Sequence, residues 1–187
     1  MEARGRSFSK PRIVILVFFL FFLIWTMLQF LGPLAIQHNT VTDLSGLVGV
    51  KDNQDEIEEL SEPWSFIYNC GDTLCHQKAS RSFFLNGNQM PFCARCTAIW
   101  LGITIGLFLI FIYKIKLDDR FIFVILAGLI PIGIDGTGQL IELWISTNPI
   151  RVITGLAVGI VCGIAIGIII DELTDILRLR KGLEVNT

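Results

Sequence analysis

Charged residues are scarce in this sequence. Aspartate, glutamate, lysine and arginine make up only 17% of its 187 residues, against roughly 25% in soluble globular domains. Hydrophobic residues make up 52%. This composition excludes an ordinary soluble domain and predicts an integral membrane protein. The formal net charge is -2, so no excess of basic residues indicates nucleic acid as a partner.

Several catalytic motifs are also absent. The sequence contains no Walker phosphate-binding loop, no nucleophile elbow and no HExxH helix. Its CxxC motif is not surrounded by a thioredoxin-like pattern of strands and helices. These absences argue against the common nucleotide-hydrolysing, esterase, zinc-protease and thioredoxin chemistries, and they leave less familiar chemistries open.

Four hydrophobic stretches are long enough to cross a membrane. A spanning helix needs about 20 mostly apolar residues for a hydrocarbon core roughly 30 Å thick. The sequence therefore predicts an all-α membrane protein with about four transmembrane helices, at residues 13–36, 97–113, 121–145 and 150–170. The first stretch exceeds the roughly 7–15 apolar residues of a cleavable signal peptide, so we expect an uncleaved signal anchor.

The distribution of positive charge predicts the orientation. Basic residues lie before the first span, between the second and third, and after the fourth: Arg4, Arg6, Lys10 and Arg12; Lys114, Lys116 and Arg120; Arg178, Arg180 and Lys181. Basic loops stay in the cytoplasm, so we expect a multi-pass protein of the cell membrane with both termini cytoplasmic. The predicted parts are a basic N-terminus with its anchor, an acidic extracytoplasmic linker, a core with a Cys/His segment and three spans, and a cytoplasmic tail: residues 1–36, 37–63, 64–170 and 171–187.

Glycines recur at four-residue spacing in two spans: Gly102 and Gly106 in the second, and Gly155, Gly159, Gly163 and Gly167 in the fourth. Such spacing places glycines on one helix face and lets a second backbone approach closely. We expect a tight helix–helix seam, and these faces are also candidates for a homo-oligomer. Cys162 lies beside the seam and is interpreted as a small apolar packing residue.

The segment between the first two spans holds four of the five cysteines. Its candidate metal ligands are Cys70, Cys75, His76, Cys93 and Cys96. Tetrahedral zinc takes four such ligands, and the spacing of Cys93 and Cys96 lets two sulfurs reach one ion. The outside of a cell is oxidising, which makes structural or redox disulfides the alternative. The sequence predicts a metal site, with zinc as the fitting cofactor, and leaves the disulfides open.

The third span carries polar residues that are costly in a membrane. Asp135, Gln139 and Glu142 follow a spacing of i, i+4, i+7, which places them on one helical stripe. A charged side chain at the bilayer centre costs about 2.5–3.5 kcal/mol on insertion scales, so function is the default interpretation. We interpret the three as candidate catalytic residues. The alternative is a structural pair of Asp135 with Arg95 or Arg151.

Two further features belong to this region. Pro131 and three nearby glycines are able to unwind the third span and expose backbone groups. Arginines at the same membrane face would attract a carboxylate or phosphate. The expected substrate-binding residues are Gln77, Arg81, Arg95, Asn148 and Arg151.

These motifs carry a family resemblance. They are Cys75-His76-Gln77, Arg81-Ser82-Phe83, Gln89-Met90-Pro91, Cys93-Ala94-Arg95-Cys96-Thr97, Asp135-Gly136 with Gln139, and Asn148-x-x-Arg151-x-x-Thr154-Gly155. Over residues 68–170 the chain resembles an uncharacterised prokaryotic membrane-protein family, catalogued as domain of unknown function 2085. The resemblance implies a multi-span membrane protein and no established reaction.

Several kinds of function fit this sequence. The first is a metal-assisted membrane enzyme whose outward-facing site acts on an anionic or lipid-linked substrate, with Asp135 as general base or further ligand. The second is a small oligomeric carrier that uses a broken third span. The third is a non-catalytic membrane scaffold with disulfide-bonded cysteines, and a thiol–disulfide oxidoreductase is the fourth. The expected partner in every case is the lipid bilayer.

Overall fold

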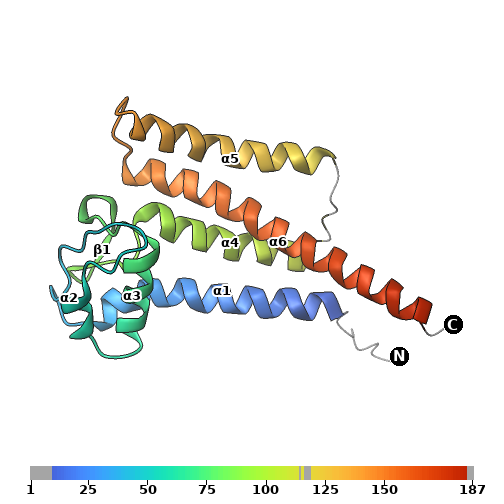
Figure 1. Ribbon diagram of the computed structural model, residues 1–187, viewed down its shortest axis with the longest axis horizontal. Helices are drawn as coiled ribbons and strands as arrows, with labels where there is room; N and C mark the ends of the chain where they lie inside the picture. The colour runs from blue at the N-terminus through green and yellow to red at the C-terminus, as the bar shows by residue number, and fades with distance from the viewer. Residues whose placement is uncertain (1–9, 114, 116–118, 185–187) are drawn as a thin grey trace, which may run out of the picture.

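The computed structural model describes residues 10–113, 115 and 119–184. It consists of a bundle of long helices with a small folded unit on one end (Figure 1). We call this unit, residues 37–93, the cap. The basic residues Arg4, Arg6, Lys114 and Lys116, which contribute to the predicted orientation, lie outside the described residues.

Among the residues that the structure describes, four helices are long and apolar enough to cross a membrane. They are α1 (Lys10–Ala35), α4 (Ala94–Ile112), α5 (Asp119–Leu140) and α6 (Asn148–Glu184). The predicted all-α membrane architecture with four spans is therefore confirmed. Helix α1 begins and α6 ends at the end of the bundle away from the cap (Figure 1), as an even number of spans requires.

The glycine-rich faces of α4 and α6 form the tightest contact in the bundle. A Cβ added at Gly159 would lie 2.3 Å from the backbone oxygen of Ile99, and one added at Gly163 would lie 2.3 Å from that of Ile103. Only residues without a side chain permit this approach, so the predicted helix–helix seam is present. The two glycine faces pack against each other within one chain. They are the same surfaces that the sequence offered as candidates for a homo-oligomer.

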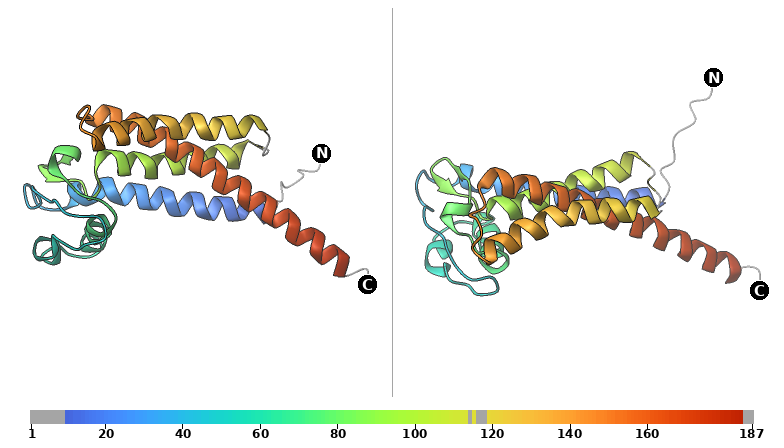
Figure 2. Two further views of the ribbon diagram at one scale, coloured as in Figure 1. Left: turned by 45° about the horizontal axis from the view of Figure 1, so that its top comes forward. Right: turned by 90° about the horizontal axis from the view of Figure 1, so that it is seen from above.

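Helix α1 is more than an anchor, because it packs along α4. The hydroxyls of Thr26 and Thr104 lie 3.2 Å apart in a buried hydrogen bond. The rings of Phe19 and Phe108 have centroids 5.4 Å apart. On the other side of the bundle α5 packs mainly on α6, which all views show (Figure 2).

Helix α5 differs from its prediction in two ways. It continues as helix through Pro131 to Leu140, so the proline and glycines do not unwind it. It also ends earlier than expected, because residues 141–147 form a loop in which Glu142 has a positive φ of 59°. Neighbouring helices allow a proline inside a membrane helix. Helix α6 starts with Asn148-Pro149, and proline is favoured in a first helical turn.

The cap contains α2 (Gln54–Glu58), α3 (Trp64–Leu74), a 3₁₀ turn η1 (Ala79–Arg81), and the antiparallel strands β1 (Phe84–Leu85) and β2 (Asn88–Gln89). Its core includes Val41, Leu44 and Ile57, which are fully buried together with Tyr68. The segment predicted to be an acidic linker is therefore part of a packed unit. Its acidic side chains, from Asp52 to Glu62, are exposed as expected for a solvated face.

Candidate metal centre and cationic cavity

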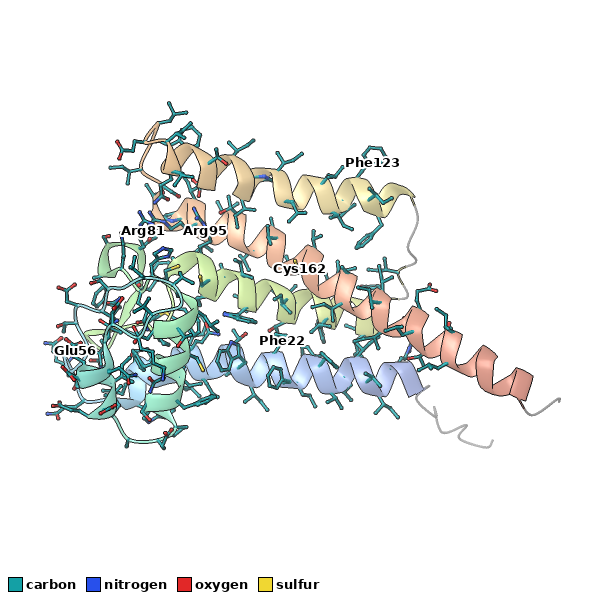
Figure 3. All side chains as sticks on the ribbon, in the orientation of Figure 1. Phe22, Glu56, Arg81, Arg95, Phe123 and Cys162 are labelled. Atoms are coloured by element: carbon teal, nitrogen blue, oxygen red, sulfur yellow. The ribbon has the colours of Figure 1, made fainter. Side chains whose placement is uncertain are left out.

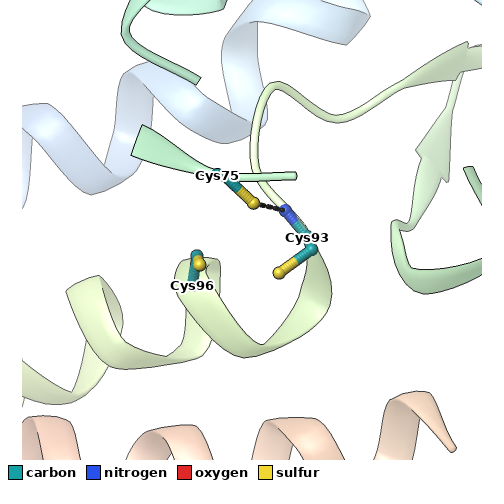
Figure 4. Close-up of side chains that lie close together, drawn as sticks. All are labelled: Cys75, Cys93 and Cys96. Carbon is teal, nitrogen blue, oxygen red and sulfur yellow. Dashed lines mark hydrogen bonds between the residues drawn. The ribbon is translucent and has the colours of Figure 1, made fainter. Parts of the chain in front are cut away.

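Three cysteines converge where the cap meets α4. Cys75 follows the end of α3, Cys93 caps the start of α4, and Cys96 lies in the first turn of α4. Their sulfur atoms all lie within 4.8 Å of one another (Figure 4). Sulfurs bound to one tetrahedral zinc at about 2.3 Å each are about 3.8 Å apart, so a small closure would let all three bind one ion.

Hydrogen bonds at the start of α4 favour negative charge on one of these sulfurs, that of Cys93. The N–H of Cys93 donates to the Sγ of Cys75 at 3.4 Å (Figure 4). Hydrogen bonds from the Cys75 and Cys96 thiols, and from backbone N–H groups of α4, hold the pKa of Cys93 well below its usual value. The bond to Cys93 in turn raises the pKa of Cys75. Free N–H groups at a helix start stabilise a thiolate in this way.

Gln77 holds the two cysteine-bearing segments together. Its side chain is fully buried, and its Nε2 donates to the backbone oxygen of Pro91 at 2.8 Å. It therefore joins the chain two residues after Cys75 to the chain two residues before Cys93. Gln77 was predicted to bind substrate, but a fully buried amide committed to the backbone positions the cluster instead.

The other two candidate ligands are not part of the cluster. His76 is exposed and points away from the buried neighbours on either side of it. Cys70 is half-buried on α3, and burial raises the pKa of its thiol. All five cysteines are free thiols in the structure, so the disulfide-bonded arrangement is not the one observed. Cys162 lies midway along the bundle, away from the cap (Figure 3).

Asp135 has the structural partners that the sequence left as an alternative. Its side chain is 4% exposed and forms an ion pair with Arg95. It also accepts hydrogen bonds from the Ser146 hydroxyl at 2.9 Å and from Trp144 Nε1 at 3.3 Å. Three donors from its own chain occupy the carboxylate. Asp135 therefore organises the loop between α5 and α6, and its role as a general base stays a prediction.

A cavity of about 710 Å³ lies beside this loop. Its wall is formed by η1 of the cap, the end of α5, the loop after α5 and the start of α6. The lining residues are Ser80, Arg81, Gln139, Glu142, Leu143, Trp144, Ile145, Ser146 and Arg151. The cavity brings together four residues of the predicted site, namely Arg81, Gln139, Glu142 and Arg151. Glu142 reaches it from the loop and not from the helical stripe.

Two guanidinium groups of this cavity have neutral partners. Arg151 is 4% exposed, and its Nη1 donates to Asn148 Oδ1 at 2.7 Å. In the amide orientation that satisfies both groups, the Gln139 oxygen accepts from both Nη atoms of Arg81, at 3.0 and 2.5 Å. Within the described part of the chain, no carboxylate forms an ion pair with Arg81 or Arg151. Asn148 thus positions Arg151, and its Nδ2 donates to the backbone oxygen of Ser82 at 3.3 Å.

The cavity and the cysteine cluster are neighbours. Arg95 stands between Cys93 and Cys96 in the sequence and binds Asp135, which in turn holds two residues of the cavity wall. Arg151 lies within electrostatic range of Cys93 and of Asp135. Arg81 and Arg95 are both at the capped end of the bundle (Figure 3). The arrangement places the cysteine cluster next to two arginines that form no ion pair with a carboxylate in the described part of the chain.

Comparison with known proteins agrees with this description. A family model described as "Predicted membrane protein (DUF2085)" matches residues 75–169, about half of the chain. The chain belongs to this family. It is 42% identical over 108 residues to an uncharacterised protein of Methanocaldococcus jannaschii, covering 54% of this chain and 69% of that one. It is 37% identical over 87 residues to an uncharacterised protein of Methanothermobacter thermautotrophicus, covering 46% of this chain and 78% of that one. No solved structure matches.

The family region begins at Cys75 and ends in α6. It therefore includes the three clustered cysteines, Arg95, Asp135 and every residue of the cavity wall. Cys70 and all of α1 lie outside it. The part of the chain that defines the family is thus the part that builds the cysteine cluster and the cavity.

Sequence reasoning missed five residues of the cavity wall, namely Ser80, Leu143, Trp144, Ile145 and Ser146. Trp144 lies within the apolar run that was predicted as the third span, and Ser146 follows it directly, so neither suggested a polar role. The signal that could have revealed the loop is the polar sequence Ser146-Thr147-Asn148-Pro149, which is typical of a helix start. Ser80 had no distinguishing signal.

Proposed function

We propose that this protein is a metal-dependent membrane enzyme in which Cys75, Cys93 and Cys96 hold a zinc ion and the adjoining cavity binds an anionic substrate. The observation that carries the proposal is the convergence of three thiols beside a cavity with unpaired arginines. Catalytic zinc sites have three protein ligands and keep a fourth position for water or substrate, whereas structural sites use four protein ligands.

The residues of the site would have three different roles. The three thiolates would hold zinc, which supplies a Lewis acid at its open position. Arg81 and Arg151 would bind and orient the anionic group of the substrate. Asp135 would fix the loop that forms the cavity wall. The distribution of basic residues supports a site on the extracytoplasmic side.

Replacement of zinc by cobalt(II) tests whether the site has an open position. The absorption bands of a cobalt–thiolate centre respond to a change of ligand. We expect added azide or imidazole to shift the bands of the cobalt-loaded chain in detergent. Bands that do not respond would show four protein ligands and a structural site, and the proposed catalysis would then be wrong.

His76→Asn and Cys70→Ser are the matched controls. Both remove a donor near the cluster without touching its three sulfurs, so both should leave the cobalt spectrum unchanged. A spectrum altered by either substitution would identify a fourth protein ligand and favour a structural centre.

A non-catalytic scaffold is the second candidate, because the Arg95–Asp135 pair is structural. A carrier that relies on a broken third span has less support, since α5 is continuous through Pro131. The cobalt experiment separates the enzyme from the scaffold.

A further inference from the structure

The cavity has an electrostatic property that the metal centre does not explain. Arg151 is almost fully buried and lacks a carboxylate partner in the described part of the chain, as does the half-buried Arg81. Asp135 is already committed to Arg95. Glu142 also lines the cavity, but it is exposed and forms no ion pair with either arginine. Asp135 and Cys93 lie within electrostatic range of Arg151, but Asp135 forms no ion pair with Arg151 in the described part of the chain. A buried charge without a carboxylate in direct contact is costly, so the cavity is suited to receive an anion.

The geometry of the two arginines favours a phosphate group over a carboxylate. Arg81 belongs to the cap and Arg151 to α6, so the two guanidinium groups approach the cavity from different elements. A carboxylate is satisfied by one guanidinium fork, whereas a phosphate has enough oxygens and charge for two. Gln139 and Asn148 hold the two side chains in place, which lowers the entropy lost on binding. The Ser80 hydroxyl, also in the wall, is a further donor.

The remaining wall of the cavity is apolar and exposed. Leu143 is 67% and Ile145 88% exposed, and they continue the exposed surface of Leu140 at the end of a spanning helix. Trp144 lies between them, and tryptophan is enriched where a membrane meets water. One side of the cavity is thus cationic, with Arg81 from the cap and Arg151 from α6, while the other is apolar and follows the end of the spanning helix α5. This combination matches a molecule with an anionic head and a hydrocarbon tail.

We propose that the cavity binds a phosphate group that is presented by a membrane lipid. The phosphate lies between Arg81 and Arg151, and the acyl chains leave the cavity over Leu143 and Ile145. At about 710 Å³ the cavity falls within the range of about 300–1,000 Å³ that is usual for small-molecule sites. The statement that this lipid is the substrate rests on the proposed metal-dependent function, but its binding does not.

Native mass spectrometry of the full chain in detergent tests the proposal. Phosphatidic acid and diacylglycerol with the same acyl chains are offered in parallel, and they differ only in the phosphate. We expect phosphatidic acid to be retained at least tenfold more than diacylglycerol. Arg81→Gln should abolish about nine-tenths of this preference, because it removes a charged donor. Lys78→Gln, a change at an exposed lysine on the same cap segment, should leave the preference intact.

Inorganic phosphate distinguishes the two sources of the group. We expect it to displace phosphatidic acid only at millimolar concentrations. If inorganic phosphate bound as tightly as phosphatidic acid, the phosphate would not need to come from a lipid. That result would overturn the proposal of a lipid ligand and indicate a soluble phosphate compound. Equal retention of diacylglycerol and phosphatidic acid would overturn the phosphate site altogether. Arg151→Gln removes a buried charge that α6 needs for its local contacts, so Arg81→Gln provides the decisive comparison if that variant fails to fold.

Zinc content measured on the same samples separates this inference from the proposed function. Zinc without a preference for phosphatidic acid would overturn the lipid inference alone. A preference for phosphatidic acid without zinc would overturn the metal-dependent function alone.

Discussion

Arg95 and Asp135 form an ion pair that joins the cysteine cluster to the wall of the cavity. Arg95 stands between two of the clustered cysteines on α4, while Asp135 holds Trp144 and Ser146 of the loop after α5. The two helices otherwise pack mainly through α6. The pair is therefore a polar link between the two halves of the candidate site.

Breaking this link should destabilise the protein. Asp135→Asn leaves the Arg95 guanidinium without its counter-charge, which costs about 3–5 kcal/mol for a buried pair. Because Arg95 is 22% exposed, we expect the lower part of that range or less. Thermal unfolding in detergent measures the loss.

A double-mutant cycle isolates the contribution of the pair. Asp135→Asn and Arg95→Gln together should be less harmful than the sum of the single changes, with a coupling of about 1–3 kcal/mol. Strict additivity of the two changes would show that the residues do not interact.

The seam between α4 and α6 should tolerate no side chain at Gly159. An added methyl group would meet the backbone oxygen of Ile99 at 2.3 Å, and overpacking of this kind costs about 1–3 kcal/mol. Gly133→Ala on α5 is the matched control, since its Cβ would meet nothing within 4 Å. Gly159→Ala should lower the unfolding temperature, and Gly133→Ala should not. Equal behaviour of the two variants would be inconsistent with the close helix approach.

Gln77 should affect zinc affinity without being a ligand. Gln77→Ala removes the bond to Pro91 that holds the segments of Cys75 and Cys93 together. Loss of a supporting residue of this kind lowers metal affinity about 10–100-fold. Competition with a chromogenic chelator measures the change. Gln54→Ala, which removes a bond to Asn69 elsewhere in the cap, is the control and should have wild-type affinity.

Zinc binding should weaken as the pH falls. The pKa of Cys93 is lowered and that of Cys75 is raised, so near neutral pH Cys93 is a thiolate while Cys75 still holds a proton. A metal ligand must lose its proton. Zinc therefore displaces at least one proton, and its affinity should fall about tenfold or more for each pH unit of acidification. An affinity that stays constant between pH 8 and pH 6 would argue against thiolate ligands.

The sequence allowed correct prediction of the features that depend on local pattern. Hydrophobic length predicted the spans, and the spacing of Gly159 and Gly163 predicted the seam, because both follow from helix geometry alone. The closeness of the Cys93 and Cys96 sulfurs also follows from local sequence spacing. Cys75 joins them only through the folding of the cap, and five candidate ligands gave no means to choose three.

The errors came from tertiary contacts that a pattern does not contain. The segment of Val41 and Leu44 looked like a polar linker, although its few apolar residues form the core of the cap. Residues 141–145 were predicted to be the end of the third span, because an apolar run does not show where a helix ends and a loop begins. The sequence context of Asp135 fitted both a base and a structural partner, and its three donors are tertiary contacts that the sequence does not contain.

The metal content of the wild-type chain tests the central claim most directly. The protein is purified in detergent without chelators, and its zinc is measured by elemental mass spectrometry together with the oxidation state of its thiols. We predict close to one zinc per chain, with zinc lost in Cys96→Ser and retained in Cys70→Ser. A wild-type chain that carries no zinc, or that holds Cys93 and Cys96 in a disulfide, would contradict the account.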